Sequence, residues 1–306
     1  MNQYQWPIHG HTTSRMIYGC MTLGSAPTDQ EHAFAALDAA VEAGFTAFDH
    51  ADIYGGGASE EVFGTWLAQR RDLRDDILIQ SKCGIRPGDP VMYDFSRQHI
   101  VTSVEGILSR LGVEYLDVLL LHRPDPLVEP EEVAHAFDYL FRSGKVRSFG
   151  VSNHSPMQIE YLRTALDHEL VANQLEISLA HPDIITAGTA VNQREPASAM
   201  RAGQVIEYCR LNGITVQAWG PLAQGMYSGR QEHAAASVVA EMAQRYGVSR
   251  EAIVLAWIMR HPAPILPVIG TTNPARIAAC AEADGVILDR TDWYGLLQAV
   301  RGTGMP

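Results

Sequence analysis

The feature that most constrains this chain is a regular alternation of short apolar runs with longer amphipathic segments. Eight runs of five to seven residues are rich in branched side chains and nearly continuous in apolarity, which is typical of strands buried on both faces. They cover residues 16–20, 46–50, 77–83, 116–122, 146–152, 171–177, 214–219 and 265–270.

The segments between these runs predict helices with recognisable ends. One helix stops at Gly44, one lies between Ser96 and Gly112, and one runs from Pro130 to Gly144. Strict alternation of strands and helices over roughly 250 residues predicts a closed (β/α)₈ TIM barrel of the α/β class. We expect a single domain over residues 1–306, with a short N-terminal hairpin and a C-terminal helix or tail.

An open doubly wound sheet is the competing architecture. It normally carries G-x-G-x-x-G after its first strand, whereas the first strand here leads into "YGCMTLGS", which does not have that spacing. The long irregular stretches 83–98 and 178–197 both follow strands, so we expect both on the face where barrels keep their chemistry.

Composition narrows the class of partner. The formal net charge is −12 over 306 residues, which argues against nucleic acid and against an anionic membrane surface. No apolar stretch is long enough for a membrane span, and the first ten residues do not form a signal peptide. The four cysteines form no C-x-x-C pair, so we expect a cytoplasmic protein without a structural metal. We also expect a monomer or a weak homo-oligomer.

Polar residues collect at the carboxyl ends of the predicted strands. The second strand gives Asp49, with Tyr54 in the following loop, the third gives Lys82 and the fourth gives His122. A lysine inside an apolar run needs an acidic partner, and Asp49 lies one strand away. The later strands end in further polar, aromatic and glycine positions, namely Ser152, Asn153, Asn173, Gln174, Trp219, Gly270, Thr271 and Thr272.

Together these residues indicate proton donation from a phenol. A free tyrosine has a pKa near 10, so a useful acid at neutral pH needs about 4 kcal/mol of stabilisation of its ionised form. An ammonium about 4 Å away supplies roughly that amount at an effective dielectric constant of about 20. We therefore expect Lys82 to lower the pKa of Tyr54, and His122 to bond the same substrate oxygen. Trp219 offers a flat face for a nicotinamide.

Each residue also has a structural interpretation. Asp49 could cap a turn, Tyr54 could be an ordinary loop tyrosine, and His122 could be a core histidine. A Schiff-base aldolase also uses an acid and a lysine at strand ends of a barrel, but it does not require Trp219. A metal hydrolase is disfavoured, because His9 and His11 precede the first strand without a third ligand nearby.

At these residues the sequence resembles the aldo-keto reductase superfamily, and most closely its bacterial branch of broad-substrate carbonyl reductases. The motifs that carry the resemblance follow in family order from residue 14 to about residue 301: "FDHADIYG", "LIQSKCG", "LLLHRPD", "GKVRSFGVSNHS", "ANQLEIS", "AWGPLAQG" and "VIGTTNPARI". The resemblance implies a catalytic tetrad of Asp49, Tyr54, Lys82 and His122. It places Asp52 and His50 outside that tetrad, as a loop acid and a structural histidine.

The resemblance also implies a cofactor site for NADP(H), with NAD(H) less favoured. In it, Ser152, Asn153 and Gln174 hold the nicotinamide carboxamide, Trp219 stacks on the ring, and Thr271, Thr272 and Arg276 bind the 2′-phosphate. The full predicted set of cofactor contacts comprises Gly19, Cys20, Met21, Ser152, Asn153, Gln174, Trp219, Gly220, Pro221, Leu222, Gly225, Gly270, Thr271, Thr272 and Arg276.

The resemblance implies reduction of a small-molecule aldehyde or ketone to an alcohol, with Tyr54 as the general acid. Some family members bind the cofactor and serve as regulatory subunits, so a regulatory role stays open. Substrate choice in the family depends on loops that correspond here to residues 84–97, 178–197 and about 290–306. The sequence does not name the substrate.

Overall fold

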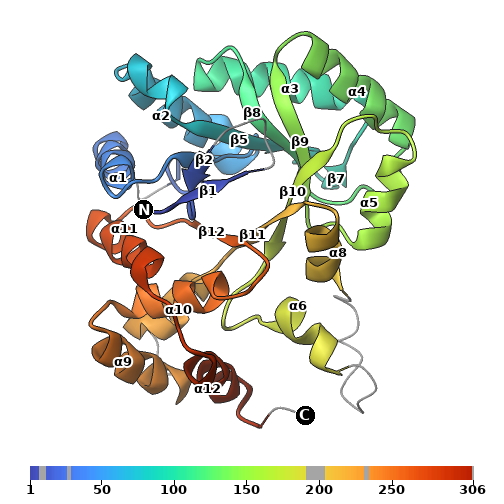
Figure 1. Ribbon diagram of the computed structural model, residues 1–306. Coiled ribbons are helices and arrows are strands. Elements are labelled where there is room, and N and C mark those ends of the chain that lie inside the picture. The colour runs from blue at the N-terminus through green and yellow to red at the C-terminus, as the bar shows by residue number, and fades with distance from the viewer. Residues whose placement is uncertain (7–11, 26–28, 191–203, 231–233, 305–306) are drawn as a thin grey trace.

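The computed structural model describes residues 1–6, 12–25, 29–190, 204–230 and 234–304 (Figure 1). Eight parallel strands close into a barrel in the order β10-β11-β12-β3-β4-β5-β8-β9, which confirms the predicted (β/α)₈ fold. These strands are β3 (Ile17–Gly19), β4 (Ala47–Asp49), β5 (Leu78–Cys83), β8 (Leu116–Leu121), β9 (Val146–Ser152), β10 (Leu170–Glu176), β11 (Thr215–Trp219) and β12 (Ile265–Ile269). Each lies within a residue or two of its predicted run.

Helices surround the barrel in Figure 1. They are α1 (Gln30–Glu42), α2 (Ala58–Leu67), α3 (Arg97–Leu111), α4 (Pro130–Arg142), α5 (Pro156–Arg163), α6 (Asp183–Thr186), α8 (Val205–Leu211), α9 (Ala234–Tyr246), α10 (Arg250–Met259), α11 (Pro274–Ala281) and α12 (Arg290–Arg301). Both predicted ends of α3 are confirmed. The Ser96 side chain caps the start of the helix, and Gly112 ends it at φ 64°.

Strand periodicity sorts side chains between the barrel interior and the helical layer. In β8, Leu119 and Leu121 pack in the large cluster between strands and helices, whereas Val118 and Leu120 pack in a separate cluster inside the barrel. The same alternation in β5 points Leu78, Gln80 and Lys82 inward. A lysine and a glutamine therefore stand above an apolar layer in the interior.

The predicted N-terminal hairpin is present as β1 (Gln3–Gln5) paired with β2 (Thr12–Ser14). Trp6, only 2% exposed, packs in the interior cluster together with Ile17, Ala47 and Leu78, the first residues of three strands. The hairpin therefore covers the amino-terminal end of the barrel, which leaves the carboxyl end for a site. A second hairpin, β6 (Ile85–Arg86) with β7 (Met92–Tyr93), stands in the long segment after β5.

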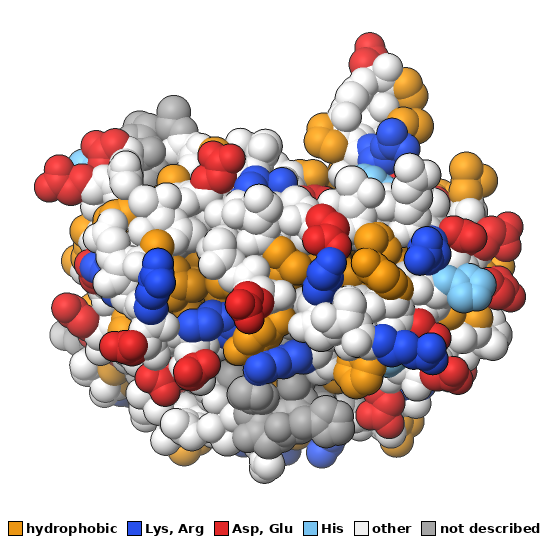
Figure 2. All heavy atoms as spheres, turned by 90° about the horizontal axis from the view of Figure 1, so that it is seen from above, with side chains coloured by type: hydrophobic (Ala, Val, Ile, Leu, Met, Phe, Trp, Pro, Cys, Tyr) orange, Lys and Arg blue, Asp and Glu red, His pale blue; other side chains and the backbone are white. Residues whose placement is uncertain are grey.

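Surface features agree with an acidic chain. Figure 2 shows acidic and basic side chains interspersed over the upper face, without a large basic area on that face. Among the described residues, no helix combines the length and the apolar character needed to cross a membrane, and no group of three or more His, Cys, Asp or Glu residues is arranged to hold a metal ion. His9 and His11 lie outside the described residues. The single-domain assignment of residues 1–306 stays a prediction.

Candidate active site

The structure brings the four predicted rim residues together on neighbouring strands. Asp49 ends β4, Lys82 is the fifth residue of β5, and His122 directly follows β8. Tyr54 begins a short 3₁₀ turn, Tyr54–Gly57, that follows β4. Because β4, β5 and β8 are adjacent in the barrel, their carboxyl ends converge.

The Lys82 ammonium is the centre of this group. It is fully buried and donates to Asp49 Oδ2 at 2.7 Å, to the His50 carbonyl at 2.8 Å and to the Tyr54 hydroxyl at 3.0 Å. An ammonium has three donors, so all three are used. Burial by itself lowers the pKa of Lys82, but Asp49 and Tyr54 outweigh it and the net direction is upward. Lys82 is therefore a fixed positive charge.

Tyr54 accepts a hydrogen bond from Lys82, so its own O–H hydrogen is free to point toward a ligand. The predicted lowering of its pKa is wrong for this geometry. Burial of the phenol raises the pKa of Tyr54, and this effect outweighs the opposing Lys82 charge, which Asp49 partly cancels. The hydroxyl is consequently protonated at neutral pH.

His122 stands edge-on to Tyr54, with the two ring centroids 6.1 Å apart and the planes at 84°. Burial, with Lys82 and Arg123 nearby, lowers the pKa of His122 to about 3. Its Nδ1 bonds to no described residue. At neutral pH the imidazole is therefore uncharged, and its buried Nδ1 has no partner among the described residues.

A layer of glutamines beneath the rim was not anticipated from the sequence. Gln80 Nε2 donates to Asp49 Oδ1 at 2.6 Å and to Gln217 Oε1 at 2.9 Å, and Gln217 Nε2 returns a bond to Gln80 Oε1 at 2.8 Å. Gln174 Nε2 donates to the same Asp49 oxygen at 3.1 Å and to Gln217 Oε1 at 2.9 Å. We call Gln80, Gln174 and Gln217 the glutamine layer. Its signal in the sequence was a glutamine inside each of three predicted apolar runs, 77–83, 171–177 and 214–219.

Asp52 and Glu60 lie behind the rim rather than in it. Glu60 is fully buried and accepts from Ser81 Oγ at 2.8 Å and from Arg110 Nε at 2.8 Å. Burial, followed by the neighbouring Glu60, raises the pKa of Asp52 to about 7. Neither acid hydrogen-bonds Lys82, which agrees with placing Asp52 outside the tetrad.

His50 contributes its backbone, not its ring, to the Lys82 contact. The ring packs edge-on to Phe63 with centroids 4.5 Å apart, and neither nitrogen bonds a described residue. Burial and the Lys82 charge lower the pKa of His50 to about 3. This is the structural histidine that the sequence predicts.

Asn153 joins several of the predicted cofactor residues. Its amide nitrogen donates to Ser152 Oγ at 2.8 Å and to the His122 carbonyl at 3.3 Å, and its oxygen accepts from Trp219 Nε1 at 3.0 Å. Asn153 adopts φ 62°, a conformation that asparagine tolerates better than most residues. Ser152 Oγ donates to the Gln174 carbonyl at 2.9 Å. The indole of Trp219 is therefore held in place at the rim, half-buried.

The segment after β11 turns sharply at two glycines. Gly220 has φ 64° and Gly225 has φ 83°. The Gly225 N–H donates to the Leu222 carbonyl at 2.8 Å. Pro221, directly after Gly220, is buried. This compact turn lies directly beyond Trp219.

The loop after β12 leads into α11. Asn273 caps that helix, accepting from the Arg276 N–H, and Thr271 Oγ1 accepts from the Asn273 N–H. The Arg276 side chain bonds to no described residue, which leaves a free guanidinium in the first turn of the helix. Gly270 is exposed, and Thr271 and Thr272 are half-buried beside it. Guanidinium, hydroxyls and a helix N-terminus together fit a phosphate group.

The remaining predicted cofactor residues lie at the end of β3 and directly after it. A Cβ on Gly19 would lie 2.9 Å from the Ile269 carbonyl oxygen, so the close approach of β3 to β12 requires glycine. Cys20 is fully buried and its N–H donates to the Asp49 carbonyl at 2.9 Å. Met21 is 55% exposed.

The rim thus divides into two arcs. Strands β4, β5 and β8 carry Asp49, Lys82 and His122, and the contiguous strands β9, β10, β11, β12 and β3 carry the predicted cofactor residues. The Asp49–Gln174 hydrogen bond crosses the interior between the two arcs.

Comparison with known proteins identifies the class. The model of the Aldo/keto reductase family matches residues 15–295. The chain therefore belongs to the aldo-keto reductase family and is an oxidoreductase, which confirms the predicted family. The chain is 37% identical over 292 residues to a 6-dehydroglucose reductase of Agrobacterium fabrum, covering 92% of this chain and 93% of that protein. It is 35% identical over 306 residues to a 6-dehydroglucose reductase of Novosphingobium aromaticivorans, covering 97% and 95%.

A solved structure is also similar. It is an aldo/keto reductase from Klebsiella pneumoniae in complex with NADP and acetate, with 25% identity and a TM-score of 0.78, covering 97% of this chain and 94% of that chain.

Proposed function

We propose that this enzyme reduces the carbonyl group of small aldehydes or ketones with NADPH, and that Tyr54 donates the proton. The observation that carries the proposal is the contact between the buried Lys82 ammonium and the Tyr54 hydroxyl at 3.0 Å. A substrate oxygen that takes the free O–H hydrogen of Tyr54 also comes near the neutral imidazole of His122. NADPH, when bound, supplies the hydride.

The chain's own residues account for the proton step. As negative charge develops on the substrate oxygen, Tyr54 passes its proton to that oxygen, and the resulting phenolate lies against the Lys82 ammonium. Asp49 holds Lys82 in position from the other side at 2.7 Å. Burial raises the pKa of Tyr54 in the resting site, so the phenol is reliably protonated before transfer. The negative charge on the oxygen then provides the drive for transfer.

Residues of the second arc fit the cofactor. Trp219 offers a half-buried indole fixed through Asn153 at 3.0 Å, suited to stacking on a nicotinamide. Both hydrogens of Gln174 Nε2 are donated inside the barrel, so its Oε1 is the atom suited to receive the carboxamide N–H. Arg276, with its free guanidinium at the start of α11, is suited to the 2′-phosphate and favours NADPH over NADH. The NADP in the Klebsiella pneumoniae relative supports this choice.

The same geometry disfavours a Schiff-base aldolase. Such an enzyme needs an uncharged amine, but all three Lys82 hydrogens are bonded and contacts with Asp49 and Tyr54 raise its pKa. The relatives named 6-dehydroglucose reductases make oxidised sugars a first substrate class to test, alongside α-dicarbonyls and cyclic ketones.

The test is the variant Tyr54→Phe, with Tyr161→Phe as its control. Tyr161 is 50% exposed on α5, so the control removes an equivalent hydroxyl far from the rim. We expect Tyr54→Phe to bind NADPH as tightly as the wild type, measured by fluorescence, while turnover falls by about a hundredfold to ten-thousandfold. Normal turnover in Tyr54→Phe would refute the assignment of the acid.

A further inference from the structure

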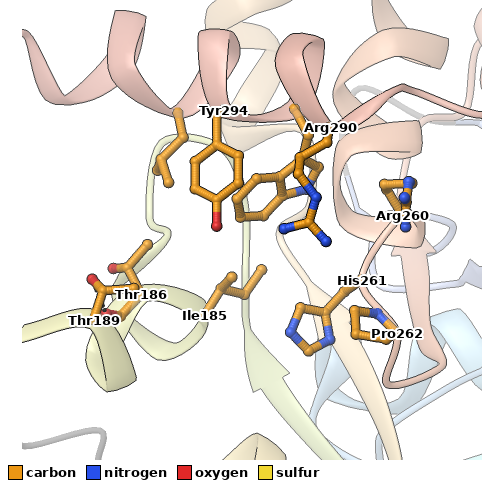
Figure 3. A pocket seen from close by; sticks show the side chains of 10 residues that line it. Ile185, Thr186, Thr189, Arg260, His261, Pro262, Arg290 and Tyr294 are labelled. Carbon is orange, nitrogen blue, oxygen red and sulfur yellow. Dashed lines mark hydrogen bonds between the residues drawn. The ribbon is translucent and has the colours of Figure 1, made fainter. Parts of the chain in front are cut away.

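A cavity of about 260 Å³ lies outside the barrel (Figure 3). Its walls come from α6, from α12 and from the connection Arg260–Pro262 between α10 and β12. That connection enters β12 at its amino-terminal end, whereas Asp49 and Lys82 stand at the carboxyl ends of their strands. This wall of the cavity therefore lies at the opposite end of the barrel from Asp49 and Lys82, whereas α6 and α12 belong to segments that the sequence predicts to influence substrate choice.

Hydrogen-bond donors converge on this cavity. Arg260 Nε donates to the Leu288 carbonyl at 2.8 Å, which fixes the side chain. Its two terminal nitrogens are left to donate to a ligand. Arg290 forms no hydrogen bond or ion pair with any described residue through its side chain, and in Figure 3 its guanidinium points toward His261. Two guanidinium groups therefore line one small space.

The histidine adds a third donor. The Ala263 N–H donates to His261 Nδ1 at 3.1 Å, so Nδ1 is an acceptor and the ring proton is on Nε2. Burial lowers the pKa of His261 by more than the Ala263 hydrogen bond and Glu207 raise it, and Arg210 lowers it further, so the ring is neutral at pH 7. A neutral imidazole in this tautomer presents an N–H group as its second polar atom.

One wall of the cavity is aromatic and rigid. Trp293 stacks on Trp257 with centroids 5.0 Å apart and planes at 8°, and each indole N–H donates to the other residue's carbonyl, at 2.9 and 3.1 Å. Tyr294 packs edge-on to Trp293 at 4.9 Å. Figure 3 shows the Tyr294 hydroxyl pointing toward Thr186 and Thr189 across the space. Flat, preorganised apolar surface of this kind favours a planar ligand.

The described residues that line the cavity include no aspartate or glutamate. Two guanidiniums and an imidazole N–H without a carboxylate partner select an anion, and the volume admits a single small molecule.

We propose that this cavity binds a small aromatic carboxylate, with the carboxylate on Arg290 and Arg260 and the ring against Trp293 and Tyr294. Such a ligand joins α6, in the segment after β10, to the C-terminal helix α12. The proposal does not depend on the reaction assigned to the barrel rim.

The experiment is calorimetric titration of the full chain with benzoate, with benzamide as the uncharged equivalent and inorganic phosphate as the anion without a ring. The variant is Arg290→Gln, and Arg71→Gln is the control, because Arg71 is an exposed arginine outside the cavity. We expect benzoate to bind more tightly than either other probe, and Arg290→Gln to weaken benzoate about tenfold or more while Arg71→Gln leaves it unchanged.

Three results would overturn the proposal. The first is no benzoate binding up to about 10 mM, which is weaker than specific recognition by two guanidiniums predicts. The second is equal binding to the wild type and to Arg290→Gln, which places benzoate elsewhere, including the barrel rim. The third is that phosphate or benzamide binds as tightly as benzoate. Tight phosphate binding would mean that the ring is not recognised, and tight benzamide binding would mean that the charge is not recognised.

Discussion

Replacing Gln217 by leucine removes three hydrogen bonds from the interior of the barrel. Gln217 accepts from Gln80 and Gln174 at 2.9 Å each and donates to Gln80 at 2.8 Å. The substitution leaves three buried polar atoms without partners: one N–H on each of the other two glutamines and the Gln80 carbonyl oxygen. All three side chains are 2% exposed or less, so water does not readily replace the lost bonds.

An unpaired buried polar group costs about 1–3 kcal/mol. Three such groups, with partial relaxation, predict that Gln217→Leu loses about 3–6 kcal/mol of the free energy of unfolding. The matched control is Gln69→Leu, in which an exposed glutamine changes and the expected effect is within about 0.5 kcal/mol. Both are measured by urea denaturation followed by circular dichroism.

A double-mutant cycle makes the reasoning sharper. In Gln80→Leu/Gln217→Leu both members of the reciprocal pair are apolar, and Asp49 Oδ1 keeps its bond from Gln174 at 3.1 Å. The double variant should therefore lose less stability than the sum of the single variants, by at least about 1 kcal/mol. Strictly additive losses, or a loss below about 0.5 kcal/mol in Gln217→Leu, would refute the view that these amides depend on one another.

Two further predictions concern titration. Burial and Glu60 raise the pKa of Asp52 to about 7 from an ordinary value of 3.8, so its contribution to stability is complete below about pH 4 and is lost as the pH rises through about 7. Asp52→Asn should therefore show a smaller fall in urea midpoint from pH 5 to pH 8 than the wild type. The control Asp75→Asn, at an exposed acid, should behave as the wild type. An equal fall in all three proteins would contradict the burial argument. Since the pKa of His122 is lowered to about 3, its imidazole signals in a nuclear magnetic resonance titration should not move between pH 5 and pH 8, and a midpoint in that range would show that the ring is accessible to water.

The fold could be predicted from the sequence because it depends on short-range patterns of apolar and polar residues. Each barrel strand is a run of apolar residues, most of them with a polar residue at the carboxyl end, and the helix signals at Ser96 and Gly112 are short-range. The sequence also predicts that Asp49 and Lys82 meet, since a buried lysine requires an acid and Asp49 lies one strand away. The family resemblance then supplied the expected roles.

The sequence could not predict how opposing effects on a pKa add up, or which residues far apart in the chain come into contact. The pKa of Tyr54 depends on how far burial exceeds the Lys82 charge, and only the assembled site decides this. The glutamine layer joins residues 80, 174 and 217, which are close only because β5, β10 and β11 share one barrel interior. The cavity beside Trp293 likewise joins α6 to α12.

The two arcs of the rim have a consequence for how this enzyme can be altered. Loops after β9, β11 and β12 can be redesigned for a different dinucleotide without touching a strand that carries the proton-donating group. Buried side-chain hydrogen bonds join the two arcs at the Asp49–Gln174 contact and at the reciprocal Gln80–Gln217 pair. A library that keeps these two pairs fixed and varies the rest of the larger arc should retain chemistry while it explores coenzyme choice.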